Sequence, residues 1–97
     1  MHYVLSMHYV YFIQSVHTKQ LYIGRTNNII RRLREHNEGN TFSTRKYAPW
    51  VLVYLEGYFS MENAVHRERT LKQFGKVYSQ LKRRIQKSIL SAQKVRG

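Results

Sequence analysis

Three short runs rich in aromatic and β-branched residues set how many strands this chain can form. Residues 8–15 (HYVYFIQS) and 20–24 (QLYIG) both have the composition of strands, and only residues 16–19 separate them. So short a connection cannot carry the chain across a sheet, and it predicts an antiparallel hairpin. The third run, residues 50–58 (WVLVYLEGY), shows little polar alternation. We therefore expect the third strand to be covered on both faces and central in its sheet.

The intervening sequence carries signals for three helices, at about residues 28–38, 61–74 and 77–93. The first follows the capping residues Thr26-Asn27-Asn28, the second follows Ser60, and a glycine comes after each of these two helices. The residues between the first helix and the third strand are polar and are expected to form a loop. The resulting order β-β-α-β-α-α predicts a small α+β domain, a three-stranded antiparallel sheet packed with three helices.

The length of 97 residues suits one domain, which we assign to residues 8–93 with an N-terminal extension at 1–7 and a C-terminal tail at 94–97. The echo of residues 1–4 (MHYV) in 7–10 leaves open whether Met1 or Met7 is the natural start. The chain has no cysteine, which excludes a disulfide framework and a thiolate zinc site. No apolar run approaches the roughly 20 residues of a membrane span, and the start does not resemble a signal peptide. We expect a cytoplasmic, monomeric protein with no membrane association.

The charge balance points to a polyanionic partner. The 17 Lys and Arg residues outnumber the 5 acidic residues and give a formal net charge of +12. A compact domain with this excess should bind nucleic acid at low salt, because its cations release counterions from the phosphates. Residues 69–97 contain nine Lys or Arg and no acid, which favours a surface that follows a phosphate backbone. The chain has no Asp, so a two-metal carboxylate cluster is not expected.

Two features of the predicted helices are candidates for chemistry. Arg32 and His36 are four residues apart and project from the same face of the first helix. Arg32 offers a permanently charged fork that suits a phosphate, and His36 can transfer a proton near neutral pH. Glu68 lies four residues after Ala64 and three before Leu71, at the edge of an apolar stripe. A carboxylate in that position needs a partner, which is either a nearby Arg or a divalent metal ion.

Tyrosines on the first two strands form a further group. Tyr9 and Tyr11 are two residues apart and share one face of the sheet, and Tyr22 lies within reach across the hairpin. Strand tyrosines usually serve packing. A phenol becomes a plausible base only beside cations or a metal, and Arg25 and Arg32 could supply such a field.

Taken in order, these residues resemble the GIY-YIG nuclease family. Tyr9-Val10-Tyr11 is similar to the first motif, with Tyr9 in place of its glycine, and Tyr22-Ile23-Gly24 matches the second residue for residue. Arg32 and His36 follow at the family's helical spacing, and residues 64–72 resemble its metal-binding helix. The likeness runs from Tyr9 to Arg84 and is greatest to the small stand-alone bacterial members, which are related to the nuclease domain of the excision-repair incision subunit. The chain lacks the asparagine that many members carry after the metal-binding glutamate.

The resemblance implies an endonuclease that hydrolyses nucleic-acid phosphodiester bonds, most naturally in DNA, with one Mg²⁺ or Mn²⁺ ion and a role in DNA repair or recombination. Glu68 would hold the ion and Arg32 would stabilise the phosphate. Tyr11 or Tyr22 would be the base, with His36 orienting or relaying the proton, and the sequence does not choose between the two tyrosines. The residues expected to bind nucleic acid are Arg25, Arg45, Lys46, Lys72, Lys82, Arg83 and Arg84.

Two other functions stay open at this point. One is a nucleic-acid-binding module that keeps the nuclease fold without catalysis. The other is a basic protein associated with a membrane surface or the ribosome through its last helix.

Overall fold

The computed structural model describes residues 6–92, so most of the predicted 1–7 extension and the whole 94–97 tail lie outside the described residues. The order of the strands and helices confirms the α+β prediction. The elements are β1 (His8–Ser15), β2 (Leu21–Thr26), α1 (Ile29–Asn37), a 3-10 helix (Arg45–Tyr47), β3 (Trp50–Tyr58), α2 (Met61–Gln73), α3 (Gly75–Arg84) and α4 (Gln86–Ala92).

The prediction of one last helix over residues 77–93 was wrong, because two helices occupy this region and the first of them begins at Gly75. The break falls at Ile85, which leaves helical geometry with φ −104° and ψ 17°. Its side chain belongs to the buried core that includes Val10 and Phe12, so the helix breaks at a residue that packs against the sheet. Gly75, expected to end the second helix, instead begins the next one.

The sheet has the order β2-β1-β3, and both pairs are antiparallel. The central strand is therefore β1 and not residues 50–58, which correspond to β3 at an edge. The register of β3 shifts between Phe12 and Ile13, which pair with Tyr54 and Leu52 and leave Val53 as an extra residue. This bulge disturbs the alternation of exposed and buried residues, which explains why β3 reads as a covered strand.

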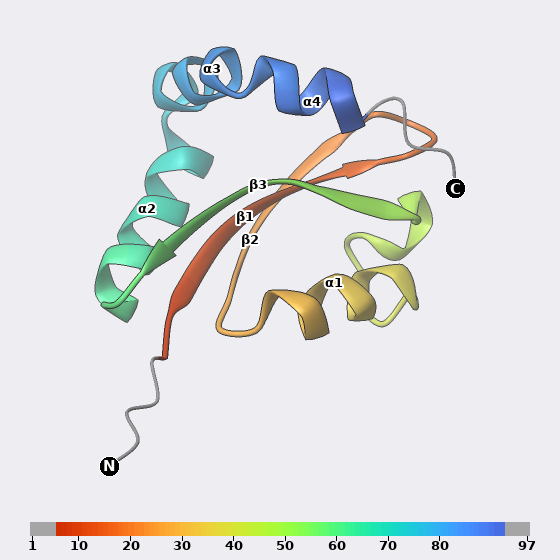
Figure 1. Ribbon diagram of the computed structural model, residues 1–97, viewed down its shortest axis with the longest axis horizontal. Helices are drawn as coiled ribbons and strands as arrows, with labels where there is room; N and C mark the ends of the chain where they lie inside the picture. Colours follow the sequence, from red (N-terminus) through yellow and green to blue (C-terminus); the bar gives the residue numbers. More distant parts are fainter. Residues whose placement is uncertain (1–5, 93–97) are drawn as a thin grey trace.

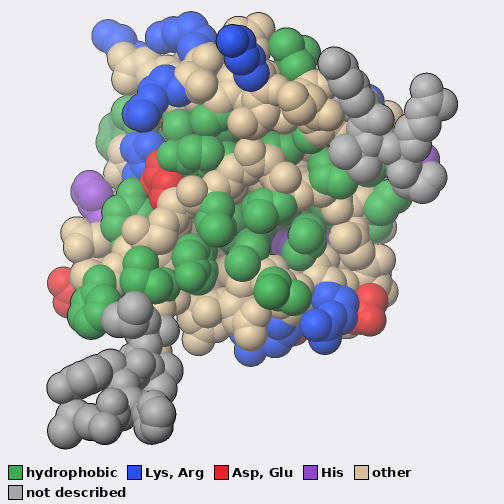
Figure 2. All heavy atoms as spheres, viewed as in Figure 1, with side chains coloured by type: hydrophobic (Ala, Val, Ile, Leu, Met, Phe, Trp, Pro, Cys, Tyr) green, Lys and Arg blue, Asp and Glu red, His purple; other side chains and the backbone are tan. Residues whose placement is uncertain are grey.

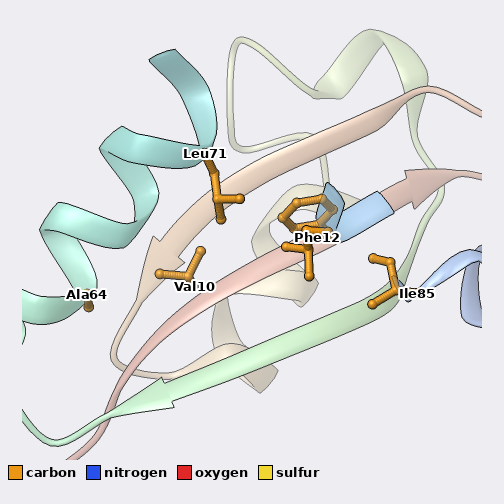
Figure 3. Close-up of a cluster of buried hydrophobic side chains, with 6 residues drawn as sticks. Val10, Phe12, Ala64, Leu71 and Ile85 are labelled. Atoms are coloured by element: carbon orange, nitrogen blue, oxygen red, sulfur yellow. The ribbon is translucent and has the colours of Figure 1, made fainter. Parts of the chain in front are cut away.

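Helices lie on both faces of the sheet, so the molecule has three layers (Figure 1). On one face, α2, α3 and α4 bury Val10 and Phe12 of β1 together with Ala64, Leu71 and Ile85. Figure 3 shows Phe12 between Leu71 of α2 on one side and Ile85 on the other. On the other face, α1 and the following loop pack against Tyr11, Ile13 and Trp50. Because β1 has a core on each side, Val10, Tyr11, Phe12 and Ile13 are all at most 1% exposed.

The predicted helix caps are confirmed. The side chain of Asn28 accepts a hydrogen bond from the Arg31 amide at the start of α1, and Ser60 accepts one from Asn63 at the start of α2. Gly39 follows α1 with φ +78°, the left-handed conformation that glycine adopts most easily. Within residues 6–92, none of the helices is long and apolar enough to cross a bilayer.

A carboxylate on β3 ties the sheet edge to α2. Glu56 accepts hydrogen bonds from Tyr54 at 2.7 Å and Tyr58 at 2.6 Å, and from two guanidinium nitrogens of Arg67, each at 2.9 Å. Burial raises the pKa of Glu56, but the hydrogen bonds from Arg67 and the two tyrosines outweigh it and leave that pKa below its ordinary value. The ionised carboxylate is therefore a stabilising part of the fold at neutral pH.

We predict that Glu56→Gln lowers the free energy of unfolding by about 1–3 kcal/mol at pH 7, because a paired and largely buried carboxylate is replaced by a weaker acceptor. Urea unfolding measures this loss. The matched control is Glu38→Gln at the exposed end of α1, which should change stability by less than about 0.5 kcal/mol. Equal losses in the two variants would contradict a structural role for Glu56.

Candidate active site

The two tyrosine-containing motifs meet at one point of the sheet, where Tyr11 of β1 pairs with Gly24 of β2. The Tyr11 ring lies across Gly24. A Cβ added at residue 24 would collide with the Tyr11 hydroxyl and ring, and even the farther ring carbon Cε1 would be 2.9 Å away. Gly24 is thus required because a phenol occupies the space that any other side chain would take.

Tyr9, which replaces the first glycine of the motif, is accommodated by a glycine on the other neighbouring strand. Tyr9 pairs with Gly57 of β3, and a Cβ at residue 57 would come within 3.2 Å of the Tyr9 ring. The departure at Tyr9 is therefore compatible with the sheet because β3 leaves room for the ring.

The hydroxyl of Tyr11 begins a buried hydrogen-bonded chain. It lies 2.8 Å from Nε2 of His36, and Nδ1 of His36 lies 2.7 Å from Oγ1 of Thr44. His36 and Thr44 are fully buried, and the Thr44 carbonyl also accepts a hydrogen bond from the Trp50 indole at 2.9 Å. Both partners of the imidazole are hydroxyls, which can donate or accept, so either neutral tautomer of His36 can form both hydrogen bonds.

Burial sets the ionisation of the hydrogen-bonded side chains Tyr11 and His36. Burial, with the positive charge of Arg32, lowers the pKa of His36 to about 4, so the imidazole is neutral at physiological pH. Burial also raises the pKa of Tyr11 to about 12, and the neighbouring Arg32 guanidinium offsets part of that rise. Tyr11 is thus a neutral phenol whose ionised form is favoured by one adjacent cation.

Arg32 is the charged neighbour of the Tyr11 hydroxyl. Its Nη1 donates to Oε1 of Glu35 at 3.0 Å, and about 30% of the side chain is exposed. Arg32 also lines a hollow of ≈ 360 Å³ that contains three arginines and one carboxylate. Its lining residues are His8, Arg25, Thr26, Asn27, Arg31, Arg32, Glu35 and Met61. This basic hollow can receive an anion at Arg32, the cation that neighbours Tyr11.

Glu68 lies beyond the β2 edge, where α2 brings it close enough for its charge to act on Tyr11. The carboxylate is 20% exposed and has two cationic partners: Nε of Arg25 is 3.4 Å from Oε1, and Nζ of Lys72 is 2.9 Å from Oε2. Of the two alternatives that the sequence left open for Glu68, the structure shows the pairing with an Arg, and the metal stays a prediction. Within the described residues, no three His, Cys, Asp or Glu side chains gather as a metal cluster.

Tyr22 lies next to this group without a hydrogen bond to it. Its ring meets His36 edge-on with centroids 5.3 Å apart, and the Lys72 ammonium is 6.0 Å from its centroid. Tyr22 is only partly buried, whereas Tyr11 is 1% exposed. The fold therefore brings Tyr11, Tyr22, Arg32, His36 and Glu68 together, and it joins only Tyr11 directly to His36.

The predicted nucleic-acid-binding residues separate into distinct groups. Arg25 and Lys72 flank Glu68 at the site. Arg45 and Lys46 lie in the loop after α1, where their charges face the rings of Phe42 and Tyr47. Lys82, Arg83 and Arg84 are on α3, in the layer opposite α1. Figure 2 shows Lys and Arg side chains gathered over α3 at the top and again near α1 at the bottom, with hydrophobic side chains between them.

Thr44 and Glu35 are site residues that the sequence did not indicate. Glu35 neighbours Arg32 along α1, and helical spacing could have suggested that pair. Thr44 follows His36 by eight residues in an irregular loop, where no periodic pattern applies. Only the folded loop, closed by the hydrogen bond from Trp50, brings the Thr44 hydroxyl to the imidazole.

The sequence and the structure were compared with protein families, with known proteins and with solved structures, and each comparison found relatives. A family model described as the GIY-YIG catalytic domain matches residues 7–82. A UPF0213 protein of Staphylococcus haemolyticus is 36% identical over 73 residues, 74% of this chain and 88% of that protein. The solution structure of the UPF0213 protein BH0048 from Bacillus halodurans has a TM-score of 0.50 and 30% identity, and the match covers 77% of this chain and 81% of that one.

A shorter match links the chain to a larger protein. The structure-specific endonuclease subunit SLX1 homolog of Giardia intestinalis is 47% identical over 45 residues, which are 43% of this chain. The match spans only 12% of the length of the Giardia protein. The similarity therefore concerns one segment of that protein and not its whole.

We predict that Gly24→Ala lowers the free energy of unfolding by about 1–3 kcal/mol, because the added methyl group must displace the buried Tyr11 ring. Chemical denaturation measures the loss. Gly75→Ala is the matched control, since a Cβ at residue 75 meets nothing within 4 Å, and it should leave stability unchanged or slightly higher. A Gly24→Ala variant as stable as the control would contradict the close contact between Tyr11 and residue 24.

His36 gives a second test through pH. Its folded-state pKa of about 4 lies below the ordinary 6.5, so the unfolded chain binds more protons between these values and stability falls as the pH drops through that window. We expect His36 to contribute about 3 kcal/mol to that fall. Unfolding at several pH values should show a shallower slope for His36→Gln than for wild type. Exposed His17→Gln should keep the wild-type slope, and a wild-type slope for His36→Gln would contradict burial of a neutral imidazole.

Proposed function

The chain belongs to the GIY-YIG nuclease family, and from that membership we propose that it hydrolyses phosphodiester bonds in nucleic acid, with DNA as the favoured substrate. The observation that carries the proposal is the grouping of a buried Tyr11–His36 pair, Arg32 and the reachable carboxylate of Glu68. The formal charge of +12 and the basic hollow beside Arg32 support a polyanionic substrate. The name of the Giardia relative supports an endonuclease.

The donor set at Glu68 fits one hard divalent cation. Mg²⁺ typically binds proteins through one or two carboxylates and keeps waters or substrate phosphate oxygens as its other ligands. Glu68 would supply the carboxylate, and the substrate phosphate would supply further oxygens. When bound, a Mg²⁺ or Mn²⁺ ion would provide Lewis-acid stabilisation of the phosphate. The absence of Asp from the sequence and the small number of Glu residues support a site for one ion rather than a two-metal carboxylate cluster.

Arg32 is suited to the phosphate itself. The guanidinium is partly exposed, lines the basic hollow and stands next to the Tyr11 hydroxyl. A phosphate in that hollow can take donors of Arg32 that Glu35 leaves free, and the fixed charge would stabilise the negative charge that builds on the oxygens. Arg25 of β2 lines the same hollow as Arg32 and would hold the phosphate from the strand.

Tyr11 is the better supported base of the two tyrosines. In the tautomer where Nδ1 of His36 donates to Thr44, Nε2 accepts the Tyr11 proton, and the Tyr11 oxygen can then take a proton from the attacking water. The negative charge of a bound phosphate would favour the imidazolium that results. Tyr22 has no such acceptor behind its hydroxyl in the described residues and would line the substrate instead.

We predict that the wild-type chain cleaves DNA in the presence of Mg²⁺ or Mn²⁺ and that Arg32→Ala lowers the rate by about 10²–10³-fold, since a preorganised cation at the phosphate is lost. Glu68→Gln should abolish the metal-dependent rate. Cleavage is measured on a panel of single-stranded, duplex, flapped and branched DNA, with RNA counterparts. Arg34→Ala, an exposed substitution on the same helix, should retain the wild-type rate.

A wild-type chain that cleaves no member of this panel with either metal would overturn the enzymatic proposal. If salt-sensitive binding persists without cleavage and Glu68→Gln leaves it intact, the chain is instead a non-catalytic nucleic-acid-binding module. Cleavage that Glu68→Gln and Arg32→Ala retain would show that a different site, or a contaminant, is responsible.

A further inference from the structure

We infer that a hollow at the open edge of β2 is a nucleobase-binding site, which takes the base of a nucleotide next to the cleaved bond. The inference rests on the proposed function, because a base arrives there only as part of a nucleic-acid substrate. Nothing in the catalytic chemistry above uses this hollow, although it adjoins the catalytic residues.

The hollow has the lining that a flat aromatic ligand requires. Its volume is ≈ 280 Å³, and it is lined by Leu21, Tyr22, Ile23, Leu71, Lys72 and Tyr78. None of these residues is acidic, and most of them are apolar or aromatic. Ligand sites of this kind are mainly apolar and carry a few polar groups that set orientation. A base offers aromatic faces for packing and an edge that can contact polar atoms.

Its position in the fold leaves the hollow accessible. β2 is an edge strand, and α2 and α3 stand beside it in one layer (Figure 1). Tyr78 of α3 is held by Phe12, whose ring stacks with it at 5.9 Å between centroids. The wall that would receive a base is therefore fixed by the core and does not depend on a mobile loop.

Each tyrosine of the hollow has a lysine against its ring. The Lys72 ammonium is 6.0 Å from the Tyr22 centroid, and the Lys82 ammonium is 5.2 Å from that of Tyr78. Both lysines are exposed, so each can turn toward a phosphate while the ring remains for the base. This alternation of aromatic and basic groups is how proteins hold single nucleotides without reading their sequence.

The two partners of Glu68 connect this hollow to the catalytic residues. Lys72 lines the aromatic hollow and bonds one carboxylate oxygen, while Arg25 lines the basic hollow and bonds the other. Glu68 thus lies between a site suited to phosphate and a site suited to a base, the two parts of one nucleotide. A base must leave its stack and its pair to enter a hollow of this kind, so we expect an unpaired nucleotide there.

The test uses the wild-type chain in EDTA, so that binding is measured without cleavage. Single-stranded DNA oligonucleotides carry the fluorescent base 2-aminopurine at successive positions around the bond that cleavage mapping identifies. We expect strong quenching at one position next to that bond and a Kd about 5- to 100-fold weaker when an abasic site replaces that nucleotide, the range supplied by packing one base on an aromatic side chain. The same 2-aminopurine in a fully paired duplex should not be quenched further.

Three variants identify the wall that binds. Tyr78→Leu should lose the quenching and bind intact DNA about as weakly as wild type binds the abasic strand, while Tyr78→Phe keeps the ring and most of the quenching. Phe59→Leu, an exposed aromatic outside the hollow, should behave as wild type. Thermal unfolding shows whether Tyr78→Leu is folded. The comparison of abasic with intact DNA uses the wild-type chain, so it does not depend on the folding of any variant.

The outcomes separate this inference from the proposed function. Salt-sensitive binding with quenching that Tyr78→Leu leaves unchanged, or an abasic strand that binds as well as the intact one, overturns the nucleobase site and leaves the nuclease proposal standing. If the chain binds no nucleic acid at low salt, both proposals are wrong. Loss of quenching confined to Tyr78→Leu, with Tyr78→Phe and Phe59→Leu normal, supports the site.

Discussion

The close approach of the Tyr11 ring to Gly24 is the contact on which the rest of the site depends. It exists because β1 and β2 pair in a register that puts Tyr11 opposite Gly24, the one glycine of β2. A slip of one residue would turn Tyr11 to the other face of the sheet and replace glycine by a residue that the ring cannot cross. The register therefore fixes where the phenol lies before any catalytic residue contacts it.

From that position the hydroxyl links the sheet to α1 and the loop beyond it. The chain runs from Tyr11 through His36 to Thr44, whose carbonyl is held by Trp50 at the start of β3. Residues from β1, α1 and the loop after it thus meet in one buried network, although Tyr11 and Thr44 are more than 30 residues apart in the sequence. Because His36 is fully buried, its imidazole stays neutral at physiological pH, and the Arg32 guanidinium is the cation beside the Tyr11 phenol.

Local signals predicted much of this arrangement, and tertiary packing decided the rest. The hairpin, the caps at Asn28 and Ser60 and the shared face of Arg32 and His36 follow from turn length, capping chemistry and helical spacing. The edge position of β3 could not be predicted, because a bulge at Val53 makes an edge strand look like a covered one. The helix break at Ile85 was also missed, since it depends on burial against β1 rather than on any local breaker.

The positive charge has two separate uses in this account. Arg25 and Lys72 contact Glu68, and Arg32 is the charged neighbour of Tyr11. The lysines and arginines of α3 lie on a different helix and suit general contact with a phosphate backbone. At the site, Arg25 and Lys72 are paired with Glu68, and Arg32 is paired with Glu35. The single charge of Glu68 is shared by two cations, so positive charge is left over for an anionic substrate that competes for Arg25 and Lys72.

The most direct test of the central claim compares single-turnover cleavage by Tyr11→Phe and Tyr22→Phe at saturating substrate and metal. If the buried Tyr11–His36 pair accepts the proton of the attacking water, Tyr11→Phe should lower the rate of the chemical step by about 10²–10⁴-fold, the range of general base catalysis. Tyr22→Phe should change that rate far less. A full rate in Tyr11→Phe, or a larger loss in Tyr22→Phe, would contradict the assignment of Tyr11 as the reacting group.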